Sequence, residues 1–266
     1  MTYIPGFRQY LKIDGNAVGI ITGGGVRDNS NLIDLRGIGN HFSQGLRAAM
    51  IQPEGNCSII VQTARLIEEA SRNADGSLDS FDMTYGDADQ DGYIHKDCKV
   101  NTLRLSFRGG EPLQADVNWR GLYFDDDGVD THVPPADNVL MFYEGDVTGL
   151  AGAPEILGGE ITINQNLEWI PVIDNNLATK KRRAKYLAEG PCIISAMFRL
   201  TEPYTTDISA DAVAYVTPIT VTFSGDNTIT LTLTNCKPET KELPFQPQAQ
   251  AVEHTVAFRA SSFTIT

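Results

Sequence analysis

An acidic stretch in the first half of the chain, DADQDGYIHKDC from Asp87 to Cys98, has the residue types and spacing of a calcium-binding loop. Asp87, Asp89 and Asp91 could supply carboxylate oxygens, and Gly92 stands where such a loop makes its sharp turn. Position twelve is Cys98, however, whereas a helix–loop–helix calcium site has a bidentate glutamate there. The flanking residues alternate as strands do. Two interpretations stay open, a calcium site and an acidic turn between strands, and no other cofactor is indicated.

A run of cations, KKRRAK, lies between residues 180 and 185. The whole chain is acidic, with 34 Asp and Glu against 21 Lys and Arg and a formal net charge of -13. This balance argues against a protein that holds DNA by general neutralisation of phosphates. A basic segment on so acidic a protein is complementary to neighbouring copies of the same chain, although a solvated loop would need no function. We therefore predict inter-subunit contacts from Lys180, Lys181, Arg182, Arg183 and Lys185.

The histidines do not form an arrangement typical of catalysis. They are scattered without metal-ligand spacing, at His41, His95, His132 and His254. No nucleophile elbow, phosphate-binding glycine loop or paired-cysteine metal motif is found in the sequence. The sequence therefore predicts that the protein is not an enzyme.

The four cysteines are too sparse for a scaffold built on disulfides. Each of them precedes or begins a run of residues typical of a strand, which favours small buried side chains. A bridge within each half, Cys57 to Cys98 and Cys192 to Cys236, remains the alternative.

The elements that would position these residues are mainly strands. Between Thr102 and Gly121, apolar side chains alternate with polar ones on both sides of the glycine pair at 109–110. Such a period of two around a short glycine loop predicts an antiparallel hairpin with one buried face. The same pattern recurs from Thr217 to Asn235, and Ser80 to Asp87 is a further strand. One helix is expected near Thr63–Asn73.

The chain also repeats itself. A shift of 135 positions aligns GGGVRDNSNLIDLRGIGN, from Gly23, with GGEITINQNLEWIPVIDN, from Gly158. The same shift aligns EGNCSII, from Glu54, with EGPCIIS, from Glu189. A second block, DCKVNTLRLSF from Asp97, aligns with NCKPETKELPF at a slightly longer shift. These matches predict a tandem duplication in which both phrases lead into the same buried strand.

The duplication predicts a mainly β chain of two antiparallel sandwich or barrel units, each with a short helix or long loop beside it. The units are residues 1–124 and 136–266, joined by an acidic, proline-containing linker at 125–135. We expect neither a signal peptide nor a membrane span, because no long apolar run is found.

This order of strands, turns and helix resembles the tail tube (major tail) proteins of long-tailed phages and related viruses. The resemblance rests on the Gly-x-Cys strand, the segment GYIHKDCKVNTLRLSFRGGEPLQADVNWRG, the segment NQNLEWIPVIDNN and the final VAFRA strand. It implies a β-sandwich flanked by a helix, whose copies close into rings that stack into a hollow tube. It also implies that the loop before the Gly-x-Cys strand, with the basic run, reaches a neighbouring ring.

The resemblance further implies a place in the virion tail, with assembly in the host cytoplasm. Tape-measure, tail-terminator and baseplate proteins would be its partners, and double-stranded DNA would pass through the lumen without specific binding. The acidity is explained either by solubility or by a wall that repels phosphate, and the resemblance favours a lumen of net negative potential.

A ring of six equivalent β-units can be built from six single units or from three chains that each contain two units. The repeat therefore predicts a ring of three chains with pseudo-sixfold symmetry and head-to-tail contacts. The alternative from another class of protein is a calcium-stabilised β-sandwich binding module, such as an adhesin or a carbohydrate-binding domain.

Overall fold

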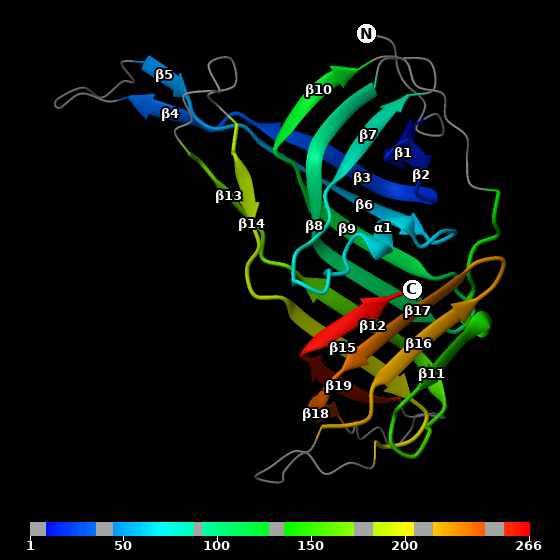
Figure 1. Cartoon of the computed structure of the whole chain (residues 1–266). Coiled ribbons are helices and arrows are strands. Elements are labelled where there is room, and N and C mark those ends of the chain that lie inside the picture. The colour runs from blue at the N-terminus through cyan, green and yellow to red at the C-terminus, as the bar shows by residue number, and fades with distance from the viewer. Residues whose placement is uncertain are drawn as a thin grey trace.

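The computed structural model describes residues 9–35, 45–87, 92–127, 136–172, 183–204, 215–242 and 253–266. The fold is mainly β, as the sequence predicted, and its sheets are antiparallel (Figure 1). Among the described residues, no helix is long and apolar enough to cross a membrane.

Eight strands form one continuous antiparallel sheet, which runs through both halves of the chain (Figure 1). Four of them belong to the first half, in the order β3 (Ile20–Asn29), β6 (Gln52–Ile60), β9 (Gln114–Arg120) and β8 (Gly92–Arg108). The other four follow in the order β12 (Ile156–Asn164), β15 (Ile193–Leu200), β19 (His254–Ala260) and β18 (Lys237–Glu242). The two halves therefore share a sheet.

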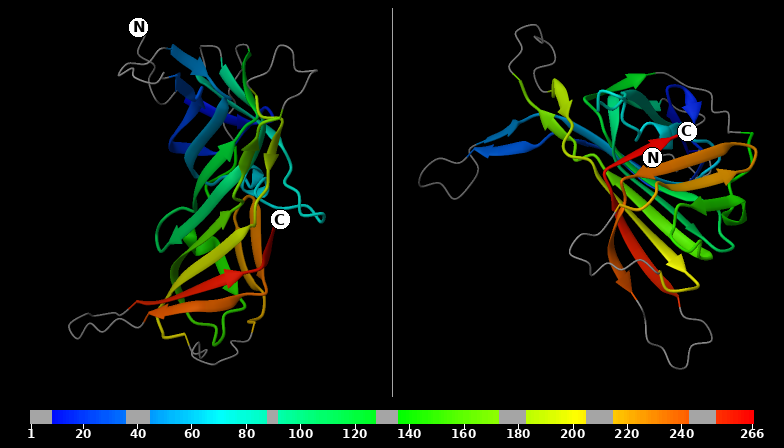
Figure 2. Two further views of the ribbon diagram at one scale, coloured as in Figure 1. Left: turned by 90° about the vertical axis from the view of Figure 1, so that its left-hand side faces the viewer. Right: turned by 60° about the horizontal axis from the view of Figure 1, so that its bottom comes forward.

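A second layer of strands covers one face of this continuous sheet (Figure 2). Over the first half it consists of β2 (Asn16–Ala17), β1 (Gln9–Ile13), β7 (Phe81–Asp87), the beginning of β8 and β10 (Tyr123–Asp127). Over the second half it consists of β11 (Gly145–Thr148), β16 (Ile219–Ser224), β17 (Thr228–Thr234) and β20 (Ser262–Ile265). The long strand β8 belongs to both layers.

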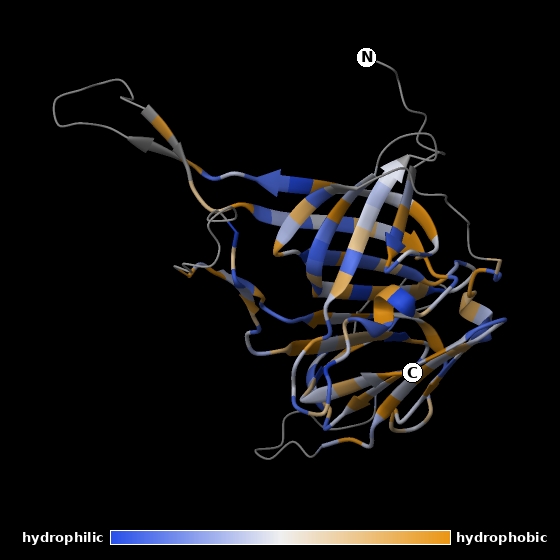
Figure 3. Cartoon of the chain, turned by 45° about the horizontal axis from the view of Figure 1, so that its top comes forward, coloured by the Kyte–Doolittle hydropathy of each residue, from blue (hydrophilic) through white to orange (hydrophobic). Residues whose placement is uncertain are grey.

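The core lies between the layers and is built by the alternation seen in the sequence (Figure 3). Leu103, Leu105 and Phe107 on β8 are buried, and so are the apolar residues of β9, which confirms the predicted hairpin. The ring of Phe107 lies 6.4 Å from that of Phe198 and 5.5 Å from that of Phe223, both in the second half. A single hydrophobic core therefore spans the two halves. The hairpin predicted at Thr217–Asn235 is confirmed as β16 and β17.

The predicted helix is much shorter than expected. Only α1 (Arg65–Glu68) is α-helical, although Leu66, Ile67 and Ala70 are buried on one face as predicted. The amides of Ala70 and Ser71 donate to carbonyls three residues back, so the chain tightens after one turn. A turn at residues 73–77 then reverses its direction.

The strand pairings of the first half recur in the second. The pairs β1·β7, β3·β6, β6·β9, β8·β9 and β8·β10 have counterparts in β11·β16, β12·β15, β15·β19, β18·β19 and β17·β20. Register shifts recur too, between Val100 and Thr102 on β8 and between Pro238 and Thr240 on β18. Asn31 and Asn166 both have positive φ, as do Asp97 and Asn235.

Two hairpins extend the structure beyond the paired layers. They are formed by β4 (Leu32–Leu35) with β5 (Gly45–Ala48), and by β13 (Glu168–Ile170) with β14 (Tyr186–Ala188). The first projects from the body of the molecule, and the second lies on the same side (Figures 1 and 2). Leu32 and Leu46 on the first hairpin and Tyr186 on the second are exposed.

One prediction about the repeated phrases is wrong. Both phrases were predicted to lead into the same buried strand. The first, with Glu54, Gly55 and Cys57, lies inside β6. The second, Glu189–Cys192, precedes β15, which begins at Ile193. The second phrase stays outside the strand because the amide of Gly190 donates to the carbonyl of Asn166, and Asn166 Nδ2 donates to the carbonyl of Pro191. Gly55 has a separate reason to be glycine, because a Cβ there would collide with the ring of Trp119.

The four cysteines are free, so the two alternative bridges are not formed. Cys57, Cys98 and Cys236 are buried, which agrees with the prediction of small core residues. Burial raises the pKa of the Cys57 thiol to about 12, with a smaller contribution from Asp116. Of the predicted linker, residues 125–127 belong to β10, and the remainder lies outside the described residues.

Candidate functional site

The feature that joins the two halves is the pairing of β8 with β12. In its register Thr102 faces Asn164, Leu103 faces Ile163 and Arg104 faces Thr162. Leu103 and Ile163 are both 0% exposed and point into the core. This internal joint is therefore apolar on its covered face. The edge of β8 that pairs with β12 is the one opposite β9, and the edge of β12 that pairs with β8 is the one opposite β15.

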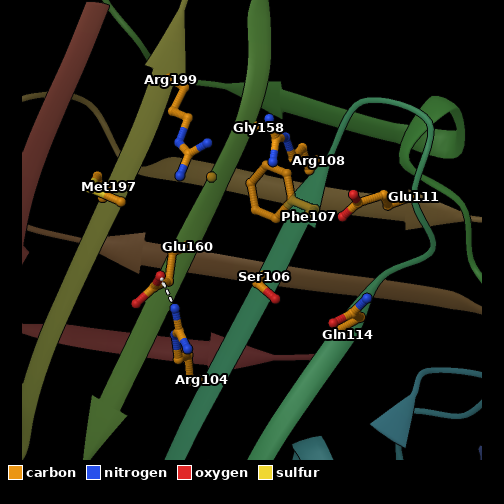
Figure 4. Close-up of a pocket in the computed structure, with 11 residues that line it drawn as sticks. Arg104, Ser106, Phe107, Arg108, Glu111, Gln114, Gly158, Glu160, Met197 and Arg199 are labelled. Carbon is orange, nitrogen blue, oxygen red and sulfur yellow. Dashed lines mark hydrogen bonds and ion pairs between the residues drawn. The ribbon is translucent and has the colours of Figure 1, made fainter. Parts of the chain in front are cut away.

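On the other side of the sheet, which we call the open face, the internal joint is ionic. Arg104 Nη2 donates to Glu160 Oε2 across the joint at 2.6 Å (Figure 4). Arg104 Nη1 also lies 3.6 Å from Asp116 Oδ2. The hydrogen bond from Arg104 holds the pKa of Glu160 below its usual range, and the same bond raises the pKa of Arg104. The cation of the joint is thus on β8 and the anion on β12.

A shallow pocket of about 140 Å³ lies on the open face beside this ion pair (Figure 4). Its lining includes Gly158 and Gly159 of β12, which lies between β8 and β15. A Cβ on Gly158 would lie 2.7 Å from the carbonyl oxygen of Phe107, and one on Gly159 would lie 2.6 Å from the Phe107 ring. These glycines serve the close approach of strands, and the lining combines arginines with Glu111 and Glu160.

A second contact between the halves is a polar cluster around Glu189. Its carboxylate accepts from Lys99 Nζ at 2.5 Å and from the amide of Leu78 at 3.1 Å, and lies 3.7 Å from Arg72 Nη1. Arg72 also donates to Gln165, whose side chain is fully buried, and to the carbonyl of Gly190. The cluster ties the segment after α1 and strand β8 to the second half.

At its two ends the continuous sheet has open edges. Strand β3 pairs only with β6 among the described strands, and β18 only with β19. Open strand edges present unpaired backbone groups and are natural sites for pairing with another chain. Both edges are charged, with Arg27 and Asp28 on β3 and Lys241 and Glu242 on β18.

Behind the β3 edge lies a buried polar chain that the sequence did not reveal. Trp119 Nε1 donates to His95 Nδ1 at 3.3 Å, which leaves the proton of a neutral imidazole on Nε2. That Nε2 lies 3.2 Å from Asp28 Oδ1. Trp119 and His95 are 0% and 1% exposed, so a buried imidazole lies directly behind the Asp28 carboxylate at the edge of the sheet.

The second half has apolar residues at the matching places. His95 pairs with Phe124 of β10, as Leu233 pairs with Phe263 of β20. Trp119 corresponds to Phe258 in the β8·β9 and β18·β19 registers, and Asp28 corresponds to Ile163 by the 135-residue shift. The polar residues Trp119, His95 and Asp28 therefore lie behind the open edge of β3. The corresponding apolar set includes Ile163, which lies at the internal joint.

The buried histidine leads to a prediction about pH. Burial lowers the pKa of His95 below 6.5, although Asp28 partly opposes this shift. The unfolded chain therefore binds a proton that the folded chain does not, so the free energy of unfolding should fall as the pH drops below about 6.5. Urea unfolding of the wild type and of His95→Gln across this range measures the effect. The fall should be smaller in the variant, and equal slopes would contradict the prediction.

The residues predicted as sites are only partly within the described structure. Asp87 ends β7, whereas Asp89 and Asp91 lie outside the described residues. No group of three or more potential metal ligands occurs among the described residues.

Of the basic run, Lys180, Lys181 and Arg182 lie outside the described residues. The guanidinium of Arg183 lies 3.8 Å from the ring centroid of Tyr123 on β10. Lys185 Nζ lies 5.5 Å from the ring centroid of Tyr186. The predicted inter-subunit contacts of these residues stay a prediction.

The amino-acid sequence matches the model of a known protein family. Residues 62–260, about three quarters of the chain, match the family model described as phage tail tube protein. The matched segment runs from the loop before α1 to the end of β19, so it includes the internal joint and strands of both halves. No curated protein sequence matched the chain.

Proposed function

Because the chain belongs to the phage tail tube protein family and is thus a structural protein of viral tails, we propose that its copies close into rings that stack into a tube for DNA. The proposal includes the finer features expected from the sequence. These are three chains in each ring, two equivalent units in each chain, and a lumen through which double-stranded DNA enters the host.

The observation that carries this proposal is the internal joint between β8 and β12. The recurring strand pairings support the equivalence of β3 with β12 and of β18 with β8. The two open edges are thus the same two edges that already pair inside the chain. A joint repeated between copies is head-to-tail, and such joints close into a ring when the rotation allows it.

The dimensions suit a conduit. Three chains would contribute eight strands each to one barrel. At a strand spacing of about 4.8 Å and a tilt of roughly 40°, such a barrel has a backbone diameter of about 45–50 Å. Inward side chains would leave a channel wider than a DNA duplex.

The open face of the sheet would line this channel, and the net negative potential expected for the lumen stays a prediction. The described open face carries charges of both signs, with Arg104 beside Glu160 and Arg259 Nε 3.0 Å from Glu239 Oε2. An arginine that is held by a carboxylate has less charge to offer a phosphate. The paired arginines of this face would therefore contribute little to DNA binding.

The two hairpins and the basic run are the parts we assign to stacking of rings. Exposed Leu32, Leu46 and Tyr186 give the hairpins an apolar surface that another ring could cover. The basic run at 180–185 adjoins the second hairpin and would find acidic partners on another copy. Tape-measure, tail-terminator and baseplate proteins are the further partners, in a tail assembled in the host cytoplasm.

The proposal involves no enzymatic activity and no cofactor, and a calcium ion at Asp87, Asp89 and Asp91 would be an addition to it. The alternative, a calcium-stabilised binding module, is not favoured by the family match.

The test is the mass and shape of the purified protein. Native mass spectrometry should give a closed species of three chains, and negative-stain microscopy should show rings or tubes with pseudo-sixfold symmetry. A protein that stays monomeric at high concentration would contradict the tube, and a ring of six chains would contradict the pairing of two units in one chain.

A further inference from the structure

We propose that the joint between chains is defined by charge, with Asp28 of one copy facing Lys241 of the next and Arg27 facing Glu242. This inference rests on the proposed function, because it names the residues that select the partner edge. The proposed joint between chains differs from the internal joint, where the corresponding pairs are Leu103–Ile163 and Arg104–Thr162.

The register follows from the structure of the chain itself. The 135-residue shift superimposes Arg27, Asp28 and Asn29 of β3 on residues 162–164 of β12. Both strands have a register shift at the same place, between Ile21 and Gly23 and between Ile156 and Gly158. The equivalence of the two strands therefore holds in their pairing as well as in their sequence.

The opposite edge is aligned by its neighbour. Lys99 of β8 pairs with Arg120, as Lys237 of β18 pairs with Arg259. After the shared bulge, Leu103 faces Val117 and Lys241 faces Val256. Residues 102–104 of β8 thus correspond to 240–242 of β18.

Applying the register of the internal joint to the open edges gives three cross-strand pairs. Asn29 faces Thr240, Asp28 faces Lys241 and Arg27 faces Glu242, in place of Asn164–Thr102, Ile163–Leu103 and Thr162–Arg104. Two of the three pairs join opposite charges. Directly opposed side chains of an antiparallel pair lie on the same face of the sheet and interact.

The Asp28–Lys241 pair carries the greater weight, because its place is covered. The corresponding Leu103 and Ile163 are completely buried in the internal joint. The carboxylate of Asp28 lies 3.2 Å from His95 Nε2, and 32% of the Asp28 side chain is exposed. Lys241 is partly buried and has no ion-pair partner among the described residues. A charge buried at this joint without its partner would be costly.

The second pair reverses the polarity of the internal joint. There the cation, Arg104, is on β8 and the anion, Glu160, is on β12. Between chains the anion, Glu242, is on β18 and the cation, Arg27, is on β3. An open β3 edge facing β8, or an open β12 edge facing β18, would bring a charge against an apolar residue. The charges thus favour pairing of β3 with β18 between chains over pairing of either strand with β8 or β12.

The experiment uses the full-length chain and reverses charge at the buried pair. Asp28→Lys and Lys241→Asp should each raise the protein concentration needed for ring formation by roughly tenfold or more, since like charges would be buried together. The double variant Asp28→Lys with Lys241→Asp should restore rings. Lys237→Asp, on the same strand but beyond the end of β3 in this register, should form rings as the wild type does. Circular dichroism and thermal melting establish that each variant is folded.

A mixture of the two single variants separates the register from the number of chains. Each variant can pair only with the other, so copies must alternate around a ring. Three is odd, and a ring of three would always contain one like-charge joint, so the mixture should give open assemblies without closed rings.

The outcomes distinguish failure of this inference from failure of the proposed function. Folded single variants that assemble normally, or a folded double variant that stays as defective as the singles, would overturn the inference while wild-type rings persist. Absence of rings in the wild type would instead overturn the proposed function. If Asp28→Lys fails to fold, the comparison of folded Lys241→Asp with folded Lys237→Asp still decides, and equal ring formation by these two variants would overturn the inference.

Discussion

Replacement of Trp119 by alanine should lower the free energy of unfolding by about 3–5 kcal/mol, the usual cost of removing a large aromatic side chain from a core. Trp119 is completely buried on β9, between β6 and β8, and Gly55 is small to make room for its ring. Its indole also donates to His95, which would lose its partner.

Trp169→Ala is the matched control for this prediction. Trp169 is only partly buried, its Nε1 donates to the carbonyl of Gly121 at 2.9 Å, and Arg120 stacks on its ring at 4.4 Å. Its loss should cost about 1–2 kcal/mol. The chain has 2 tryptophans, so each variant leaves the other as a fluorescence reporter during urea unfolding. Similar losses in the two variants would argue against the central place of Trp119.

Glu189→Gln should lower the free energy of unfolding by about 2–4 kcal/mol, because it leaves Lys99 and Arg72 without the carboxylate between them. The side chain of Glu189 is 15% exposed, so solvent replaces little of the lost interaction. Glutamine keeps the shape and one acceptor oxygen, and the effect therefore reports the charge. Because this cluster ties the two halves, hydrogen exchange should also increase across the segment after α1.

The repeat supplies the control. Glu54→Gln changes the residue that the sequence aligns with Glu189, but Glu54 lies 3.8 Å from an Arg27 whose side chain is 71% exposed. An ion pair so open to solvent contributes about 1 kcal/mol or less. Thermal and urea unfolding of both variants should therefore separate them clearly. Equal effects would mean that the two glutamates have the same role, against the structure.

Local pattern was enough to predict the hairpins. Alternation of apolar and polar residues specified which side chains of β8, β9, β16 and β17 are buried, because a strand has two faces and one of them meets the core. Local pattern failed for the helix, where only one turn remains of the apolar stripe around Leu66. A stripe shows which side is buried and does not show how far hydrogen bonding continues.

Contacts between residues far apart in the chain could not be predicted from the sequence. Arg72 meets Gln165 and Gly190, and Trp119 meets His95, through the closing of layers that no local spacing encodes. The repeated phrases misled for the same reason. Glu54 and Glu189 occupy similar sequence, but the first lies inside a paired strand and the second precedes one. The signal that could have pointed to the edges that we propose for assembly was the difference between the repeats, at Asp28 against Ile163 and Lys241 against Leu103.

The continuous sheet has a mechanical consequence. Hydrogen bonds between strands run across the sheet, so in the closed ring that we propose they would carry tension around its circumference. Every second joint in that ring would lie inside one chain, with apolar residues on its covered face, and the alternate joints would lie between chains, with charged residues at the same covered places. Such a wall has three seams. It should split lengthwise along them under load, leave each chain whole, and yield sooner when salt is raised.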